Sequence, residues 1–187
     1  MIHPNIKEEY AIILDFLPHG DPFDRRPMHQ KTAIAQALGK DHFTLLELVP
    51  KKEKFLDLHE EVYIGPEERE KIHHILSKIP LSKLTQTARS EIEVVAEELV
   101  NKNESKFIEF FNIAQPINTR IHQLELLPGI GKNHTKEIVE KREENLFTSF
   151  KDLKERIKLM PDPAKVIVKR IFVELNNEDK HKLFVQR

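Results

Sequence analysis

The chain has 187 residues, of which 39% are apolar and 33% are charged, a composition typical of a globular protein with one core or two small ones. The absence of cysteine excludes disulfides, thiolate nucleophiles, iron–sulfur clusters and cysteine-ligated zinc. No apolar run approaches the roughly 20 residues of a membrane helix, and the N-terminal residues lack a signal-peptide pattern, so we expect a cytoplasmic protein with no membrane segment.

The net charge of −1 conceals an asymmetry along the chain. Up to Gln115 there are 15 Lys/Arg and 20 Asp/Glu, net −5, whereas the rest of the chain holds 15 and 11, net +4. Lys/Glu-rich proteins produce such splits by chance, but the positive end is also the part of the chain better suited to a polyanion.

The N-terminal third has the pattern of a small β-structure. Tyr10–Leu17 and His42–Val49 are short apolar runs that predict buried strands, and Phe55–Leu58 and Val62–Ile64 add two shorter candidates. Between the first two strands, the spacing of apolar residues in Met28–Leu38 predicts a short helix. Three or four strands so close together predict a small antiparallel barrel or curled sheet.

From Gly65 onward the apolar spacing fits helices. Ile72, Ile75, Leu76 and Ile79 form one helical stripe. A second stripe after Pro80 is expected to be core and consists of Leu84, Ala88, Ile92, Val95, Ala96 and Leu99. A third helix carries an apolar group of Phe107, Ile108 and Phe111 and ends before Pro116. We therefore predict a barrel over residues 1–65, a helical connector over 66–115 and a separate domain over 116–187.

The most informative segment is the glycine-containing turn Leu127–Lys132, with the sequence LPGIGK. Asn118 or Thr119 can cap a helix that runs to Leu127, and Lys132 opens a second helix. Gly129 and Gly131 permit backbone conformations and close approaches that a Cβ hinders, so a phosphate can reach the main-chain N–H groups. The second helix contributes its positive N-terminal end, next to the Lys132 ammonium. Because none of these groups contacts a base, binding is expected to be independent of sequence.

The predicted contacts with nucleic acid extend from the turn into the second helix. They are Pro128, Gly129, Ile130, Gly131, Lys132, Asn133 and Lys136. Main-chain N–H groups and a lysine engage the phosphate chains of DNA and RNA alike, so either is a possible ligand.

A second hairpin of this kind is expected about one motif length downstream. Pro161 lies 33 positions after Pro128, and the helical frame fits, but Asp162 and Ala164 replace the two glycines. Asp162 repels phosphate and Ala164 hinders its approach. We therefore predict a degenerate second hairpin with only a packing role.

The C-terminal part resembles helix-hairpin-helix proteins, and Asn118–Ile157 is similar to the competence DNA-receptor type, including the stretch Arg142–Leu153. A wider set of short segments is spread over Tyr10–Phe184: His19-Gly20, Ala35–Ala37, Phe43, Leu45–Glu47, Val62–Gly65, Phe110–Asn112 and Leu124–Lys132. Through these segments the chain resembles an uncharacterised archaeal family, domain of unknown function 655. That resemblance implies an oligonucleotide-binding (OB) barrel joined to a helix-hairpin-helix module, and an archaeal source.

The loop after the first strand holds the other candidate site. It contains a group of metal-ligating or catalytic residue types: His19, Asp21, Asp24 and His29. Their spacing matches no ligand motif, so we expect a polar loop and predict no catalytic residue, metal or cofactor. Three basic residues of this loop are possible secondary contacts to nucleic acid: Arg25, Arg26 and Lys31.

The sequence as a whole predicts an α+β protein with an OB-like antiparallel barrel, a helical middle and a C-terminal helix-hairpin-helix module. The expected function is non-enzymatic binding of DNA or RNA through the phosphate backbone. An alternative is an adaptor with a purely structural hairpin that docks onto a transcription or translation protein. A further alternative is a metal-dependent enzyme acting on nucleic acid, which would require the His19–His29 loop to bind a divalent ion.

Overall fold

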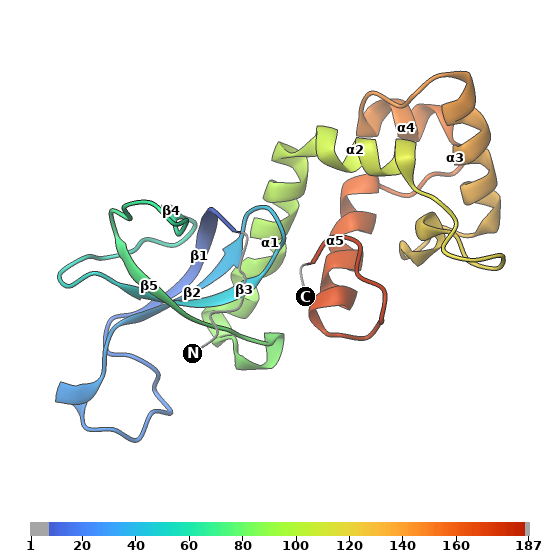
Figure 1. Ribbon diagram of the computed structural model, residues 1–187. Helices are drawn as coiled ribbons and strands as arrows, with labels where there is room; N and C mark the ends of the chain where they lie inside the picture. The colour runs from blue at the N-terminus through green and yellow to red at the C-terminus, as the bar shows by residue number, and fades with distance from the viewer. Residues whose placement is uncertain (1–7, 186–187) are drawn as a thin grey trace. The chain divides into compact units, whose positions relative to one another are not determined.

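The computed structural model describes residues 8–185 and divides the chain into two compact units (Figure 1). Unit 1 holds the described residues up to Ala96, together with Phe184 and Val185, and unit 2 is Glu97–Leu183. The predicted boundary at residues 65/66 falls inside unit 1, and the predicted boundary at 115/116 falls inside unit 2. The chain passes from one unit to the other within a helix, α1 (Gln86–Lys102).

Unit 1 is built on a five-stranded antiparallel sheet that curls into a half-barrel (Figure 1). Its strands are β1 (Tyr10–Leu17), β2 (Ile34–Gly39), β3 (Leu45–Pro50), β4 (Glu61–Tyr63) and β5 (Ile72–Lys78). They lie in the order β4-β1-β2-β3-β5. The five strands are those expected of an OB-like fold, and they exceed the three or four that the sequence predicted.

Side chains that alternate along the inner face of the sheet form the core of unit 1. Ala11 and Ile13 of β1 lie in one buried cluster with Ala35 and Ala37 of β2. The same cluster includes Leu46, Leu48, Leu56, Val62, Ile64 and Ile72. The small alanines allow the sheet to curve tightly around this core, because they leave room for the larger side chains opposite.

Three predictions about elements of unit 1 are wrong. Met28–Leu38 is not a helix: only Met28–Gln30 forms a short 3₁₀ turn, η1, and Ile34–Gly39 is strand β2. The stripe from Ile72 onward is not helical either, since Ile72–Lys78 is strand β5, paired with β3. Phe55–Leu58 forms no strand.

The sheet is joined to the start of α1 through partly buried polar contacts. The Gln36 side chain donates to the Lys83 carbonyl at 3.0 Å and accepts from the Thr85 N–H at 2.8 Å. The Thr85 hydroxyl in turn accepts from the Ala88 N–H at 3.1 Å and so caps the start of α1. A second short 3₁₀ turn, η2 (Leu81–Lys83), precedes this cap. The predicted α1 stripe from Leu84 to Leu99 is buried, as expected.

Unit 2 contains four further helices and one 3₁₀ helix. They are α2 (Glu104–Ile113), η3 (Gln123–Leu126), α3 (Lys132–Glu144), α4 (Phe150–Arg156) and α5 (Pro163–Leu175). Its buried apolar residues include Phe107 and Phe111 of α2 and Ile138 of α3. Among the described helices of the chain, none is long and apolar enough to cross a membrane.

The helix predicted before the LPGIGK turn is shorter than expected. Only Gln123–Leu126 is helical, as 3₁₀ helix η3, and its N-cap is His122 rather than Asn118 or Thr119. Asn118 instead shapes the preceding loop, because its side-chain oxygen accepts from the N–H groups of Arg120 at 2.8 Å and Ile121 at 3.0 Å. An isolated bridge between Pro116 and His122 closes this loop.

Candidate nucleic-acid interface

The LPGIGK turn is anchored from inside by its two apolar side chains. Leu127 and Ile130 are buried, at 1% and 4% exposure, and the Ile130 N–H donates to the Leu127 carbonyl at 3.0 Å. Ile130 was predicted as a contact, but its side chain is buried and its N–H already donates within the turn, so Ile130 offers neither group to a phosphate. Gly129 and Gly131 lie on the exposed side of the turn.

The two glycines of the turn are present for different reasons. Gly129 has φ +91°, a conformation that L side chains rarely adopt, so the fold itself requires glycine there. Gly131 has φ −101° and ψ −174°, which is ordinary extended backbone. A Cβ placed on Gly131 would meet no described atom within 4 Å. Neither the backbone conformation nor internal packing requires glycine at position 131, and the free space beside it is open to a ligand.

Helix α3 begins immediately after this glycine. Gly131 is its N-cap, no side chain of the described residues caps it, and its first turn has no acidic residue. The first N–H groups of a helix have no partners within the helix, and they carry a partial positive charge. Lys132 and Asn133 are exposed at this end. Lys136 is exposed one turn further on and lies 3.8 Å from Glu140, an ion pair too open to immobilise it.

The second hairpin has the opposite electrostatics. Asp162 caps α5, and its carboxylate accepts from the Lys165 N–H at 3.1 Å. This carboxylate therefore occupies the position that a phosphate would need. Ala164 is buried, and a Cβ on Gly129 would lie 3.8 Å from the Pro161 ring, so the second hairpin lies against the first.

A buried arginine holds the chain leading into the turn. Arg170 of α5 donates to the Leu126 carbonyl at 3.0 Å, to Glu174 at 2.8 Å and to Asp179 at 3.0 Å. Its side chain is only 3% exposed. Hydrogen bonds from the His181 N–H and from Arg170 lower the pKa of Asp179. The network fixes the backbone one residue before Leu127.

Arg142 lies in the stretch that resembles competence DNA receptors, but its role in the structure is internal. Its guanidinium donates to the carbonyls of Phe111 and Ala114, both at 2.9 Å, at the C-terminal end of α2. Burial lowers the pKa of Arg142. Nearby, Asn112 and Phe147 exchange two hydrogen bonds of 2.9 Å. These contacts hold α2 against α3 and the chain that enters α4.

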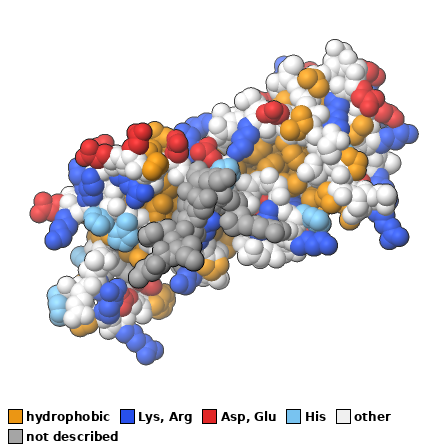
Figure 2. Space-filling view, viewed as in Figure 1, with side chains coloured by type: hydrophobic (Ala, Val, Ile, Leu, Met, Phe, Trp, Pro, Cys, Tyr) orange, Lys and Arg blue, Asp and Glu red, His pale blue; other side chains and the backbone are white. Residues whose placement is uncertain are grey.

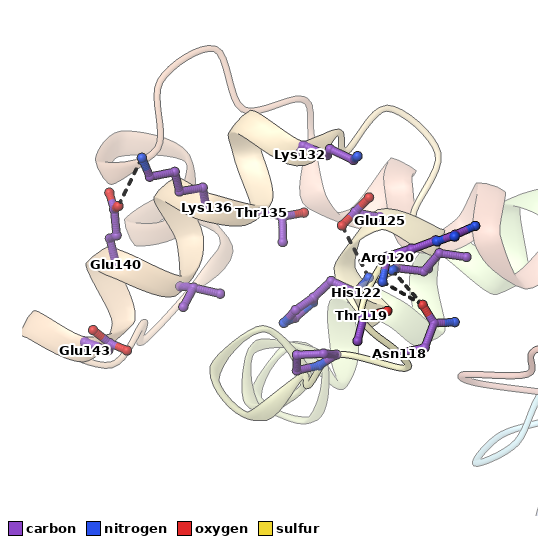
Figure 3. A pocket seen from close by; sticks show the side chains of 13 residues that line it. Asn118, Thr119, Arg120, His122, Glu125, Lys132, Thr135, Lys136, Glu140 and Glu143 are labelled. Atoms are coloured by element: carbon purple, nitrogen blue, oxygen red, sulfur yellow. Dashed lines mark hydrogen bonds and ion pairs between the residues drawn. The ribbon is translucent and has the colours of Figure 1, made fainter.

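Beside α3, along its length from Lys132 to Glu143, lies a pocket of about 550 Å³ that the sequence did not predict (Figure 3). Lys132, Thr135 and Lys136 line it from α3, and Arg120 and His122 line it from the opposite segment. Thr135 follows Lys132 by three residues and therefore lies on the same face of the helix. This spacing is the sequence feature that could have indicated that both residues line the pocket.

His122 is held neutral in the pocket wall. Its Nδ1 accepts from the Leu124 N–H at 3.1 Å, which leaves the ring proton on Nε2. Burial, and next the positive charge of Arg142, lower the pKa of His122. Glu125 completes a capping box by accepting from the His122 N–H at 3.3 Å.

The basic residues predicted as secondary contacts belong to unit 1, in the loop between β1 and β2. Arg26 forms an ion pair with Asp24 at 2.7 Å, and Lys31 donates to the Asp21 carbonyl at 3.5 Å. Arg25 is exposed. Residues 8–185 contain no group of three or more His, Asp or Glu that could hold a metal. On the face drawn in Figure 2, basic and acidic side chains are interspersed over the surface.

The fold and the hairpin together define a class: an α+β protein with a curled five-stranded antiparallel sheet and a separate helical unit that carries a glycine-containing turn. The model of one family, described as protein of unknown function (DUF655), matches residues 7–186. The chain belongs to this family.

Two archaeal relatives agree with this assignment. The chain is 44% identical over 185 residues to the uncharacterized protein MJ0038 of Methanocaldococcus jannaschii, and the match covers 98% of this chain and 82% of that protein. It is also similar to the crystal structure of Af1531 from Archaeoglobus fulgidus, a DUF655 protein, with a TM-score of 0.87 and 42% identity. That match covers 96% of this chain and 100% of the other.

Proposed function

We propose that this protein binds DNA or RNA by gripping the phosphate backbone at the Leu127–Lys132 turn, without reading sequence and without catalysis. The observation that carries the proposal is Gly131. Its backbone conformation suits any residue and its missing Cβ leaves open space, so glycine at this N-cap keeps the approach to the main-chain N–H groups free for a phosphate.

The neighbouring groups are those that a phosphate requires. The uncapped N-terminus of α3 presents main-chain N–H donors, and Lys132 adds a full positive charge at the same end. At the N-terminus of α5, by contrast, the Asp162 carboxylate already accepts a hydrogen bond from the Lys165 N–H. A single hairpin that contacts about two phosphates predicts a salt slope near −2 and dissociation constants of about 10⁻⁴ to 10⁻⁶ M.

The β1–β2 loop of unit 1 is a candidate for secondary contacts. Of its three basic residues, Arg25 is the best placed to meet a phosphate, because it is exposed, whereas Arg26 is already paired with Asp24. The same proposal includes a cytoplasmic location and protein partners that act in transcription or translation.

The direct test is Gly131→Ala, measured by fluorescence anisotropy with labelled duplex DNA, single-stranded DNA and structured RNA across a salt series. The new methyl group has room in the free protein, so the thermal midpoint should stay within a few degrees of wild type. Because the methyl group stands where the phosphate approaches, affinity should fall roughly tenfold.

A matched pair of lysine variants separates the two hairpins. Lys132→Gln should weaken binding of every sequence and reduce the salt slope by about one. Lys165→Gln, at the corresponding position of the second hairpin, should change neither the affinity nor the salt slope. Equal effects of the two variants, or a Gly131→Ala protein that binds like wild type, would refute the proposal and favour an adaptor whose hairpin is structural.

A further inference from the structure

The pocket beside α3 contains a buried hydroxyl group that the fold does not use. Thr135 is 7% exposed, and its Oγ1 has no hydrogen-bond partner among the described residues. Figure 3 shows this hydroxyl directed from α3 toward the segment that carries His122 and Glu125. A buried hydroxyl without a partner costs free energy, so an atom supplied by a ligand would recover that loss.

Positive and negative side chains around the pocket are equal in number. Its wall holds three cationic side chains and three carboxylates: Arg120, Lys132, Lys136, Glu125, Glu140 and Glu143. His122 adds no charge, since it is held neutral. Such a wall suits neither a second phosphate nor a cation. It suits an uncharged group with many hydrogen-bonding atoms.

The pocket also has apolar surface and the size for such a group. Pro116, Ile121 and Val139 contribute apolar contacts, and the volume of about 550 Å³ lies within the range of small-molecule sites, roughly 300 to 1,000 Å³. Lys132 belongs both to this wall and to the turn that we propose as the phosphate site. A phosphate at the turn and a group in the pocket can therefore belong to one nucleotide.

We infer that the pocket binds the nucleoside attached to the phosphate held at the turn, with the Thr135 hydroxyl as one of its hydrogen-bonding groups. This inference rests on the proposed function and adds a preference to it. A nucleoside inside a duplex is paired and stacked, and removing it costs energy. The protein should therefore prefer unpaired, single-stranded nucleotides to the paired nucleotides of a duplex.

The test compares a blunt duplex with the same duplex carrying a single-stranded overhang, in DNA and in RNA, by fluorescence anisotropy at fixed salt. Wild type should bind the overhang more tightly. Thr135→Val keeps the shape and removes the hydroxyl, so overhang affinity should fall roughly threefold to tenfold while blunt-duplex affinity stays unchanged. The DNA and RNA arms show which sugar the pocket accepts.

Two controls accompany this variant. Thr135→Ser keeps a hydroxyl and should retain the overhang preference. Thr44→Val removes the other buried hydroxyl that has no partner among the described residues, in unit 1, and should bind like wild type. Thermal unfolding of each variant verifies that the fold is intact.

These experiments distinguish failure of nucleoside binding in the pocket from failure of phosphate binding at the turn. If wild type binds blunt and overhanging duplexes equally, or if Thr135→Val keeps the preference, the pocket does not hold a nucleoside, and phosphate binding at the turn stands. If Gly131→Ala weakens the binding of both duplexes, the turn is the phosphate site. If no nucleic acid binds, the proposed function and the inference both fail.

Discussion

His122 links the pocket to the stability of unit 2. Its neutral ring caps η3 through Nδ1, and burial together with Arg142 lowers its pKa. The folded protein therefore binds fewer protons than the unfolded chain once the pH falls below the ordinary histidine value of about 6.5. The contribution of His122 to the free energy of unfolding is present above that pH and is lost as the pH falls.

We expect His122→Asn to remove this pH dependence while keeping the cap, because asparagine is a good N-cap residue. Urea denaturation of both proteins between pH 5 and pH 8 tests it. The midpoint of wild type should decline more steeply on acidification than that of the variant. Parallel curves would show that His122 is not the group that titrates.

Some residues of the candidate site could be predicted from the sequence, and others could not. The importance of Gly129 and Gly131 follows from the sequence pattern, whereas the difference between them depends on φ and on empty space, which only coordinates reveal. Thr135 was not predicted, since an ordinary threonine within a helix gives no sign that its hydroxyl lacks a partner.

At the scale of elements, the N-termini of α3 and α5 form a natural comparison. The Asp162 carboxylate both caps α5 and gives that end a negative charge. Asp162→Ala should therefore lower the free energy of unfolding by about 1 kcal/mol, and Asp162→Asn, which can still cap, should cost much less. Chemical denaturation measures both changes. A loss of equal size in the two variants would mean that charge, not the hydrogen bond, provides the stabilisation.

The wrong predictions of β2, β5 and η3 have separate physical causes. Every residue of β2 is buried, so the strand lacks the alternation that distinguishes strands from helices. In β5, two irregularities of register against β3 interrupt the period of two, and the spacing of Ile72, Ile75 and Ile79 then fits a helix. The spacing of Leu124 and Leu127 by three residues fits a 3₁₀ turn as well as an α-helix.

At the scale of the whole molecule, the buried Arg170 network holds several separate segments of unit 2 together. Arg170→Met leaves the fully buried Glu174 carboxylate without this cation, so we expect a loss of about 3 to 5 kcal/mol. Hydrogen exchange should show faster exchange in α3 and α5, with the β1–β3 sheet core unchanged, because the network lies entirely within unit 2.

The double variant Arg170→Met/Glu174→Met provides the control for this prediction. Replacing both charges with apolar side chains of similar size should recover much of the lost stability. If the double variant is as unstable as the single one, the hydrogen bonds to Leu126 and Asp179 contribute more than the ion pair with Glu174.

The way in which the turn is anchored has a kinetic consequence. Buried Leu127 and Ile130 and the Arg170 bond to Leu126 hold the backbone of the turn in one conformation before any ligand arrives. Under the proposed function, capture of a phosphate would need no rearrangement, so the observed association rate should rise linearly with ligand concentration without reaching a plateau. Contacts would be brief, with residence times set by dissociation, and the protein would sample many positions along a nucleic acid in succession.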